Sequence, residues 1–296
     1  WTSSNEYLGN FAGSDINYAL FAREQAIEAE TVTVAVTDRN GITVRDSVTL
    51  SVNVQPSTES TDIEPLVGGV ADYGIERAVS NMGAAQQRGF ARRFNAEGVT
   101  QRFNWTGKNV WELDFVQGNY DDLYVDNADI VFYIGHGWGG GFTFESNVTD
   151  GSINYKQNNT AWGNKDLEFL SLLSCQVLKT NFNGQNWAQR WGQEFAGLHL
   201  LTGFHTNAHD WAKFGKRYAQ YLLGRQVGFT SITLPVRAAW FQAKKEKQPD
   251  GNRAVVIGPM GPSGVTNYND YFWGQGSMGP DIRGSNLKGW WRVTYK

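Results

Sequence analysis

The chain has 296 residues, enough for one large domain or two, with 41% hydrophobic and 19% charged residues. This composition excludes a disordered chain or a coiled coil, and no apolar run approaches the roughly 18 residues that span a membrane. The formal net charge of −3 argues against a broad electrostatic grip on nucleic acid. The single cysteine, Cys175, excludes a disulfide scaffold within the chain and a cysteine-based zinc knuckle.

The N-terminal region has the pattern of β-strands. Residues 31–54 alternate with period two on both sides of Asn40-Gly41, which predicts a β-hairpin. Such strands are typical of immunoglobulin-like sandwiches, although a whole sandwich needs roughly 100 residues. We therefore expect a β-rich, immunoglobulin-like segment over 1–55, either part of a sandwich or packed on the main domain. A polar linker follows over 56–61.

Residues 62–296 alternate between buried strands and helices. The expected strands cover 129–134, 167–174, 198–204, 254–257 and 290–295, and the expected helices cover 82–96, 186–196, 214–223 and 236–247. Near-continuous apolar strands between helices favour an α/β domain with a mostly parallel sheet covered on both faces. An irregular, aromatic-rich stretch occupies about 258–290.

Two predicted strands end at residues that can carry chemistry. Residues 129–134 lead to His136, and residues 167–174 lead to Cys175. Ligands bind beyond the carboxyl ends of strands in open α/β sheets, so an active site is expected there if the two strands are neighbours. A nearby imidazole activates a thiol as a nucleophile. The backbone N–H groups of Gly137 and Cys175 would stabilise the negative charge that develops on a carbonyl oxygen.

A hydrophobic strand ending in His-Gly, followed by a second ending in Cys, resembles the caspase-like cysteine peptidases, which include caspases, legumains, gingipains and the CHAT-domain proteases. The resemblance rests on 131–137 and 169–175 and is nearest to the gingipain and CHAT end of the group. It implies a three-layer caspase-like α/β fold and an endopeptidase that requires no cofactor and acts on peptides or proteins. It also implies His136 as the general acid and base and Cys175 as the nucleophile.

Other functions stay open. Residues 173–178 depart from the family's usual pattern around the cysteine, so a non-catalytic module that binds glycans or proteins is one alternative. His205 and His209 have i, i+4 spacing, and together with His136 they would make the three-histidine zinc site of a metal hydrolase.

Further candidates surround these strands. The residues expected to line a substrate pocket are Trp138, Glu168, His205 and Asp210. The carboxylate of Asp210 or that of Glu168 would select a basic group of the substrate. Oxygen ligands that would suit a structural calcium ion gather at Asp121, Asp122, Asp126 and Asn127. The absence of lysine before Lys108, the single cysteine and the sandwich-like strands favour a secreted, periplasmic or cell-surface protein.

Overall fold

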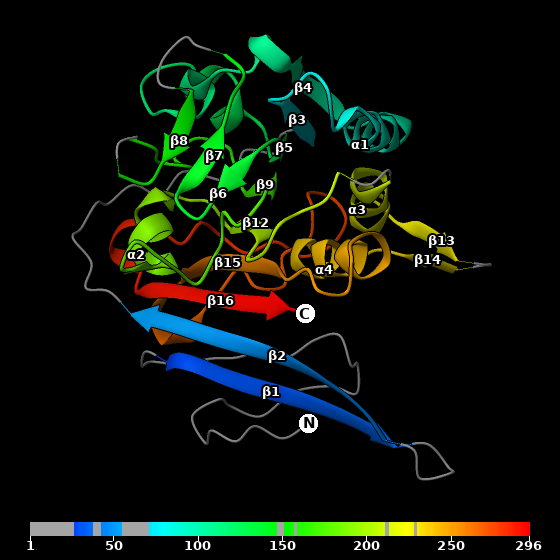
Figure 1. Ribbon diagram of the computed structural model, residues 1–296, viewed down its shortest axis with the longest axis vertical. Coiled ribbons are helices and arrows are strands. Elements are labelled where there is room, and N and C mark those ends of the chain that lie inside the picture. The colour runs from blue at the N-terminus through cyan, green and yellow to red at the C-terminus, as the bar shows by residue number, and fades with distance from the viewer. Residues whose placement is uncertain are drawn as a thin grey trace.

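The computed structural model describes residues 71–146, 151–156, 159–210, 213–227 and 230–296, together with the backbone of two N-terminal strands. Within these residues nine strands form one sheet in the order β1-β2-β16-β15-β12-β9-β5-β3-β4 (Figure 1). The strands are β1 Ile27–Thr37, β2 Thr43–Val54, β3 Asp72–Arg77, β4 Thr100–Thr106, β5 Ile130–Ile134, β9 Phe169–Leu173, β12 Leu200–Phe204, β15 Ala254–Met260 and β16 Gly289–Tyr295.

The strands from β4 to β12 pair in parallel. β15 pairs with β12 in the antiparallel direction, and β16 pairs with β15 in the same way. After β3 the chain adds β4 on one side of β3, and it then adds β5, β9 and β12 on the other side of β3. The direction of strand order therefore reverses between β3 and β5, which is where open α/β sheets bind ligands. The prediction of an α/β protein with a mostly parallel sheet is confirmed for the seven strands from β16 to β4.

The N-terminal strands form the predicted hairpin, β1 with β2, although residues 38–42 of its turn lie outside the described residues. In β2 the stretch from Thr49 to Val54 pairs with β16. The hairpin thus continues the sheet of the main domain, which is one of the two arrangements that the sequence leaves open. Its immunoglobulin-like character stays a prediction, and the linker 56–61 lies outside the described residues.

Both faces of the sheet are covered from β4 to β16 (Figure 1). One face packs against the helices α1 Ala84–Ala96, α3 Phe214–Leu222 and α4 Val236–Lys247. The opposite face packs against α2 Trp187–Trp191, a small sheet of β6 Gly137–Trp138, β7 Gly141–Thr143 and β8 Ser152–Asn154, and several 3₁₀ turns. Two short hairpins complete the elements, β10 Asn181–Phe182 with β11 Gln185–Asn186, and β13 Arg225–Val227 with β14 Thr230–Ile232.

Helix α1 shows how the sequence directs this packing. Phe90, Ala91 and Phe94 recur at helical spacing and are buried, while Arg93 lies in the last turn, where a cation favours the helix. The ring of Phe90 stacks on Phe132 of β5 with 4.7 Å between ring centroids. The predicted helix over 82–96 is therefore present and covers the strand that leads to His136.

Glu76 of β3 is a buried carboxyl group without a partner. It is 0% exposed, it lies opposite Tyr133 of β5, and neither carboxylate oxygen has a hydrogen-bond partner. Burial, and then the charge of Asp114, raises the pKa of Glu76 well above its usual range. An unfolded glutamate ionises near pH ~4.3, so Glu76 lowers the free energy of unfolding progressively as the pH rises above that value.

Replacing Glu76 by leucine is expected to raise the free energy of unfolding by about 1–3 kcal/mol at pH 8, because an unpartnered buried polar group is removed. The gain should shrink toward pH 4, where the carboxyl group is protonated in both states. Urea unfolding of wild type and Glu76→Leu at the two pH values measures both effects. Glu76→Gln is the control, since it removes the ionisation and keeps the polar group. A gain that does not vary with pH would contradict the buried carboxyl as its source.

Candidate active site

The two predicted catalytic residues follow neighbouring strands. β5 and β9 are adjacent and parallel, with Ile134 opposite Leu173, and the N–H of Gly135 donates to the carbonyl of Leu173 at 3.3 Å. His136 and Cys175 therefore leave the sheet at the same edge, next to the point where the strand order reverses. The condition on which the sequence argument depended, that these strands are neighbours, is met.

Gly137 brings the two strand ends into direct contact. A Cβ atom on Gly137 would lie 2.2 Å from the Oγ of Ser174 and 3.0 Å from the carbonyl oxygen of Cys175. Real Cβ atoms do not approach other atoms so closely, so a residue without a side chain is needed here. The glycine after the histidine thus allows the backbone of one motif to pack on the backbone of the other.

The imidazole and the thiol differ in accessibility. His136 is exposed, whereas Cys175 is half-buried and its Sγ donates to the carbonyl of Ala208 at 3.5 Å. The backbone carbonyl of His136 accepts from the N–H of Thr143 at 3.0 Å, and the hydroxyl of Tyr133 donates to the carbonyl of Thr143 at 2.5 Å. These bonds fix the start of the β6–β7 hairpin over the end of β5.

The segment after β12, residues 205–210, forms another wall of the site. The N–H of Gln176 donates to the carbonyl of Thr206 at 2.9 Å, and the side-chain amide of Gln176 donates to Asn207 Oδ1 at 2.8 Å. Gln176 has a φ of 58°, so the chain turns sharply directly after Cys175. The loop that carries the thiol is therefore held on the segment that follows the next strand.

Three of the predicted pocket residues lie at this edge. Trp138 is in β6, two residues beyond His136, and His205 directly follows β12. Asp210 is also here, but its carboxylate accepts from the N–H of Gly83 at 2.6 Å, at the start of α1. An anion at that position stabilises a helix N-terminus, so Asp210 also serves the fold.

Glu168 lies at the opposite edge, because it precedes β9 whereas Cys175 follows it. Burial, and then the charges of Asp129 and Asp166, raise the pKa of Glu168 well above its usual range. Asp72, Asp129 and Asp166 also form a group whose carboxylate oxygens lie within 4.8 Å of one another. The structure therefore places Glu168 among other acids, one strand length from the thiol.

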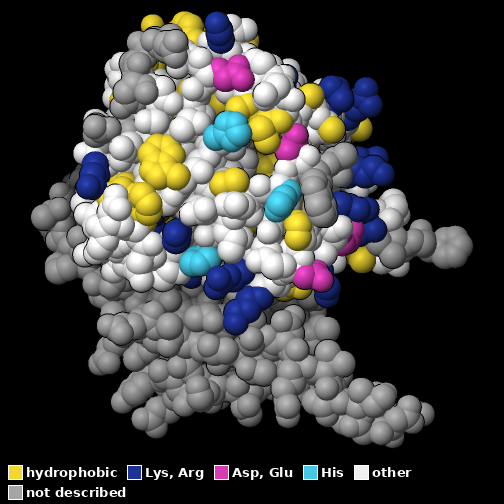
Figure 2. Space-filling view, in the orientation of Figure 1, with side chains coloured by type: hydrophobic (Ala, Val, Ile, Leu, Met, Phe, Trp, Pro, Cys, Tyr) yellow, Lys and Arg dark blue, Asp and Glu magenta, His cyan; other side chains and the backbone are white. Residues whose placement is uncertain are grey.

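The three histidines of the metal alternative do not converge. Among the described residues, the groups with ligand atoms within 4.8 Å of one another consist of aspartates and include none of His136, His205 and His209. Figure 2 shows histidine side chains at separate places on this face. The Nδ1 of His205 instead accepts from the N–H of Thr180 at 3.2 Å.

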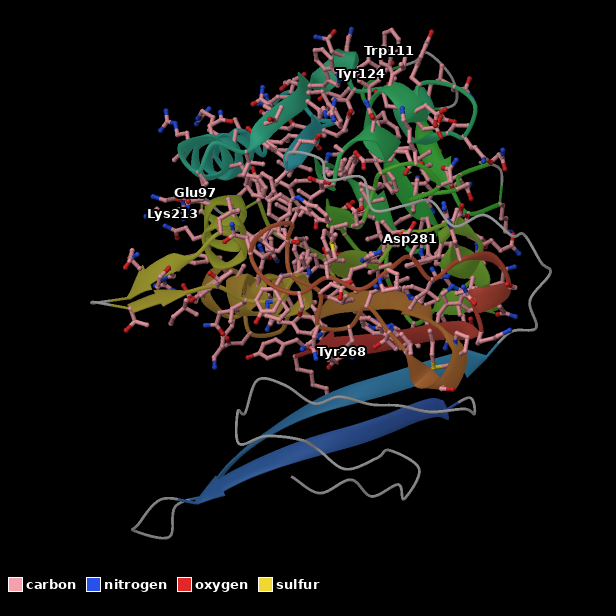
Figure 3. All side chains as sticks on the ribbon, turned by 180° about the vertical axis from the view of Figure 1, so that it is seen from behind. Glu97, Trp111, Tyr124, Lys213, Tyr268 and Asp281 are labelled. Atoms are coloured by element: carbon pink, nitrogen blue, oxygen red, sulfur yellow. The ribbon has the colours of Figure 1, made fainter. Side chains whose placement is uncertain are left out.

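His199 is a buried ionisable group that the sequence did not single out. Its Nδ1 lies 2.7 Å from Asp270 Oδ2, and its Nε2 lies 3.2 Å from Asp281 Oδ1. Burial lowers the pKa of His199, but the hydrogen bonds and charges of the two aspartates outweigh it and raise the pKa above 6.5. Asp281 belongs to the irregular segment between β15 and β16, seen from behind in Figure 3. His199 fastens this segment to the start of β12.

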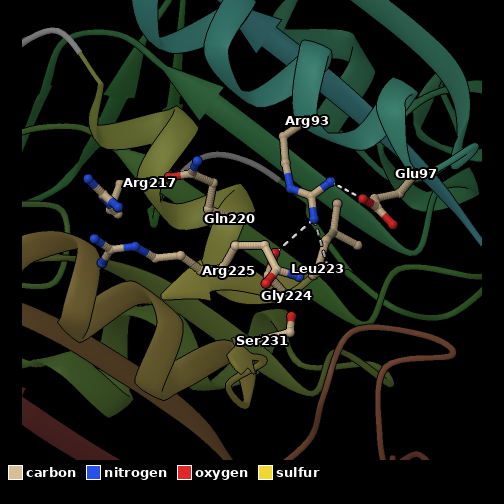
Figure 4. Close-up of a pocket in the computed structure, with 9 residues that line it drawn as sticks. Arg93, Glu97, Arg217, Gln220, Leu223, Gly224, Arg225 and Ser231 are labelled. Atoms are coloured by element: carbon tan, nitrogen blue, oxygen red, sulfur yellow. Dashed lines mark hydrogen bonds and ion pairs between the residues drawn. The ribbon is translucent and has the colours of Figure 1, made fainter. Parts of the chain in front are cut away.

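A cavity of about 550 Å³ lies away from the thiol, on the side of α1 and α3 (Figure 4). Arg93 in its wall pairs with Glu97 and donates to the carbonyls of Leu223 and Gly224 at 2.9 and 2.8 Å. Arg225 pairs with Glu246 at 2.6 Å. The arginines of this wall therefore have acidic partners, Glu97 in the wall and Glu246 beside it.

The fold and these side chains define a mixed α/β protein with an imidazole and a thiol on neighbouring strand ends. Residues 67–295 match the family described as a domain of unknown function (DUF6345), and the chain belongs to this family. Comparison with curated proteins gives no match. In the part of the chain that the structure describes, every helix is too short or too polar to cross a membrane.

Proposed function

We propose that the protein is a cysteine hydrolase, and specifically an endopeptidase, in which His136 and Cys175 form a catalytic dyad. The observation that carries the proposal is the contact of Gly137 with Ser174 and Cys175 at the ends of adjacent parallel strands. The caspase-like resemblance of the two motifs supports the same assignment, and with it a three-layer caspase-like fold.

The proposed reaction uses groups that follow adjacent strands at this edge. The sulfur of Cys175 attacks the carbonyl carbon of a peptide bond, and a thioacyl enzyme forms as the amine leaves with a proton from His136. Water activated by His136 then hydrolyses the thioester and frees the thiol. The N–H groups of Gly137 and Cys175 would bind the oxyanion of each tetrahedral intermediate. Trp138, His205 and the exposed side of Asp210 would line the substrate site.

The setting that we propose is extracytoplasmic. A secreted, periplasmic or cell-surface hydrolase meets peptide or protein substrates, and a single thiol without a disulfide partner is available there for catalysis. The net charge of −3 supports proteins rather than nucleic acid as substrates.

The single cysteine allows a direct test of the dyad. Native Cys175 should react with iodoacetamide at pH 7 about tenfold faster than the same cysteine in the urea-unfolded chain, because imidazole promotes the thiolate. His136→Ala should remove this advantage, and His209→Ala, which removes another exposed imidazole, should retain it. A native thiol that reacts only after unfolding would overturn the dyad and favour the non-catalytic binding module.

A structural calcium ion is a separate proposal. Carboxylate oxygens of Asp121, Asp122 and Asp126 lie within 4.8 Å of one another. Asp121 is only 2% exposed, and its Oδ1 has no hydrogen-bond partner. Burial is the main cause that raises the pKa of Asp126 to about 7, although its Oδ1 accepts from the N–H of Gly163 at 2.6 Å. A divalent cation would compensate these charges, so the residues fit the ion.

Calcium at about 100 times its Kd should raise the melting temperature by about 5 °C, and chelation should reverse the rise. Asp121→Asn should abolish the shift, because it removes the charge of the unpartnered carboxylate. Asp250→Asn, which changes an exposed acid elsewhere, is the matched control. Equal shifts in wild type and Asp121→Asn would eliminate this site.

A further inference from the structure

A cluster of cations surrounds His205 beside the loop that carries Cys175. We define this basic cluster as Lys179, Arg190, Arg253 and Arg292. Burial, and then the positive charges of all four residues, lower the pKa of His205 to about 4. His205 is therefore neutral at pH 7, and the positive charge of the cluster belongs to the lysine and the arginines.

Two members of the basic cluster are buried and bind backbone carbonyls of the cysteine loop and of the β6–β7 hairpin. Arg190 is 1% exposed and donates to the carbonyls of Gly139 and Lys179. Arg292 is 4% exposed and donates to the carbonyl of Leu178 at 3.2 Å, while its Nε has no hydrogen-bond partner. Carbonyl dipoles, together with the hydroxyl of Thr294 at 2.7 Å from Arg292, satisfy these guanidinium groups in part and leave their net charge uncompensated.

Neither the buried nor the exposed members have an acidic partner. Among the residues described with side chains, no carboxylate forms an ion pair with any of the four. Buried charges are normally paired, because removing them from water costs several kcal/mol each. Burial lowers the pKa of Arg190 to about 10 and that of Arg292 to about 9, and the mutual repulsion of the arginines adds to the effect on Arg292. The cluster therefore leaves an uncompensated positive field at this edge of the sheet.

Lys179 and Arg253 carry this field to the surface next to the thiol. The N–H of Lys179 donates to the carbonyl of Gln176 at 2.9 Å, within the turn that follows Cys175. The N–H of Arg253 donates to Oγ1 of Thr206 at 2.8 Å, and the carbonyl of the same threonine binds the N–H of Gln176. Lys179 is half-buried and Arg253 is exposed, and Figure 2 shows basic side chains gathered beside histidine on this face.

We propose that the basic cluster gives the Cys175 site a preference for substrates that carry a carboxylate beside the bond attacked, with Lys179 and Arg253 contacting that carboxylate. The inference rests on the proposed function and reverses the selection of a basic group expected from Glu168 and Asp210. Glu168 lies at the opposite edge of the sheet, and the carboxylate of Asp210 is bound to the start of α1.

The preference can be measured on the thiol itself with two small alkylating agents. Iodoacetate and iodoacetamide both transfer a two-carbon group to sulfur and release iodide, and only iodoacetate carries a carboxylate. The ratio of the two rate constants at low ionic strength should be about tenfold higher in the native protein than in the urea-unfolded chain. The excess should decline as salt is added, because exposed charges are screened.

The double variant Lys179→Gln/Arg253→Gln should bring the ratio close to that of the unfolded chain, and it leaves the buried arginines in place. Arg92→Gln/Lys245→Gln is the matched control, since it removes the same charges from exposed positions on α1 and α4. A ratio that the first double variant leaves unchanged, or that the control lowers equally, would overturn the inference.

Failure of the dyad can be distinguished from failure of the preference. A rate with iodoacetamide that does not depend on His136 counts against the dyad, while the ratio still reports on the basic cluster. If the native thiol reacts with neither reagent, glutarate supplies a second readout. It should raise the melting temperature of wild type but not of Lys179→Gln/Arg253→Gln at matched ionic strength. Equal shifts in the two proteins would overturn the inference.

Discussion

Replacing Cys175 by alanine is expected to abolish peptide hydrolysis, because the chain has no second thiol to form the thioacyl intermediate. Replacing His136 by alanine should lower kcat about 10²- to 10⁴-fold, the usual contribution of a positioned acid and base. The substrates come from a library of internally quenched peptides in which acidic, basic and neutral residues are varied around the cleaved bond. Turnover is followed by fluorescence in wild type and in both variants.

The controls for this experiment separate chemistry from folding. Wild type, Cys175→Ala and His136→Ala should unfold at similar urea concentrations, since His136 is exposed and Cys175 is half-buried. His209→Ala should retain activity. Hydrolysis that persists at the wild-type rate in Cys175→Ala would show that a contaminant or another group of the chain cleaves the peptides, and the dyad would be rejected.

Gly137→Ala should reduce kcat by about 10²-fold, because misplacing catalytic groups by ~1 Å has an effect of this size. The added methyl group would lie 2.2 Å from Ser174 Oγ and 2.9 Å from a methyl carbon of Val177. Atoms of one of the two strand ends must shift, and we expect this to move His136 relative to Cys175. Steady-state kinetics with the best peptide of the library measures the loss, and we expect it in kcat rather than in KM.

Two further variants test whether the loss of kcat in Gly137→Ala has a steric origin. Gly251→Ala is the matched control, because a methyl group there meets no atom within 4 Å and the backbone φ is not positive. Ser174→Ala should leave activity unchanged, since its Oγ has no hydrogen-bond partner, and should partly restore Gly137→Ala by removing the nearest obstacle. Full activity in Gly137→Ala would show that the two strand ends tolerate separation.

The sequence predicted the strands that carry the candidate site because these strands are buried on both faces. Ile130 to Ile134 and Phe169 to Leu173 are fully apolar apart from Ser171 and the hydroxyl of Tyr133, and such runs can be recognised without knowledge of their neighbours. Their order in the sheet could not be read from the chain. Adjacency follows from the parallel pairing of β5 with β9, which depends on residues far apart in sequence.

β3 and β4 were not predicted, and the reason is visible in their side chains. β3 contains Asp72, Glu76 and Arg77, which interrupt the apolar pattern although all three are buried. Arg77 donates to Gln87 Oε1 at 2.7 Å, and Asp72 accepts from the N–H of Asp129 at 3.1 Å, partners that only the tertiary structure supplies. Periodicity therefore fails where polar groups are buried with distant partners.

Sequence patterns also fail to show the partners of the charged residues around the candidate site. Glu168 stands at the start of the predicted strand 167–174, away from Cys175, but nothing local shows that the carboxylate of Asp210 binds Gly83. Arg292 reaches the loop of Cys175 from the last strand, and its bond to the carbonyl of Leu178 joins positions 114 residues apart. Substrate selectivity thus depends on contacts that spacing along the chain does not encode.

The pairing of β2 with β16 has a consequence for how the protein is made. β2 ends at Val54 and its partner begins at Gly289, so the hairpin emerges from the ribosome long before the strand on which it docks. Until then its edge is an unpaired template for other strands. Synthesis proceeds at about 5–20 residues per second, so this exposure lasts for roughly ten seconds or more. Chaperone binding during translation should therefore concentrate on the hairpin, and a nascent chain stalled before Gly289 should remain sensitive to protease there.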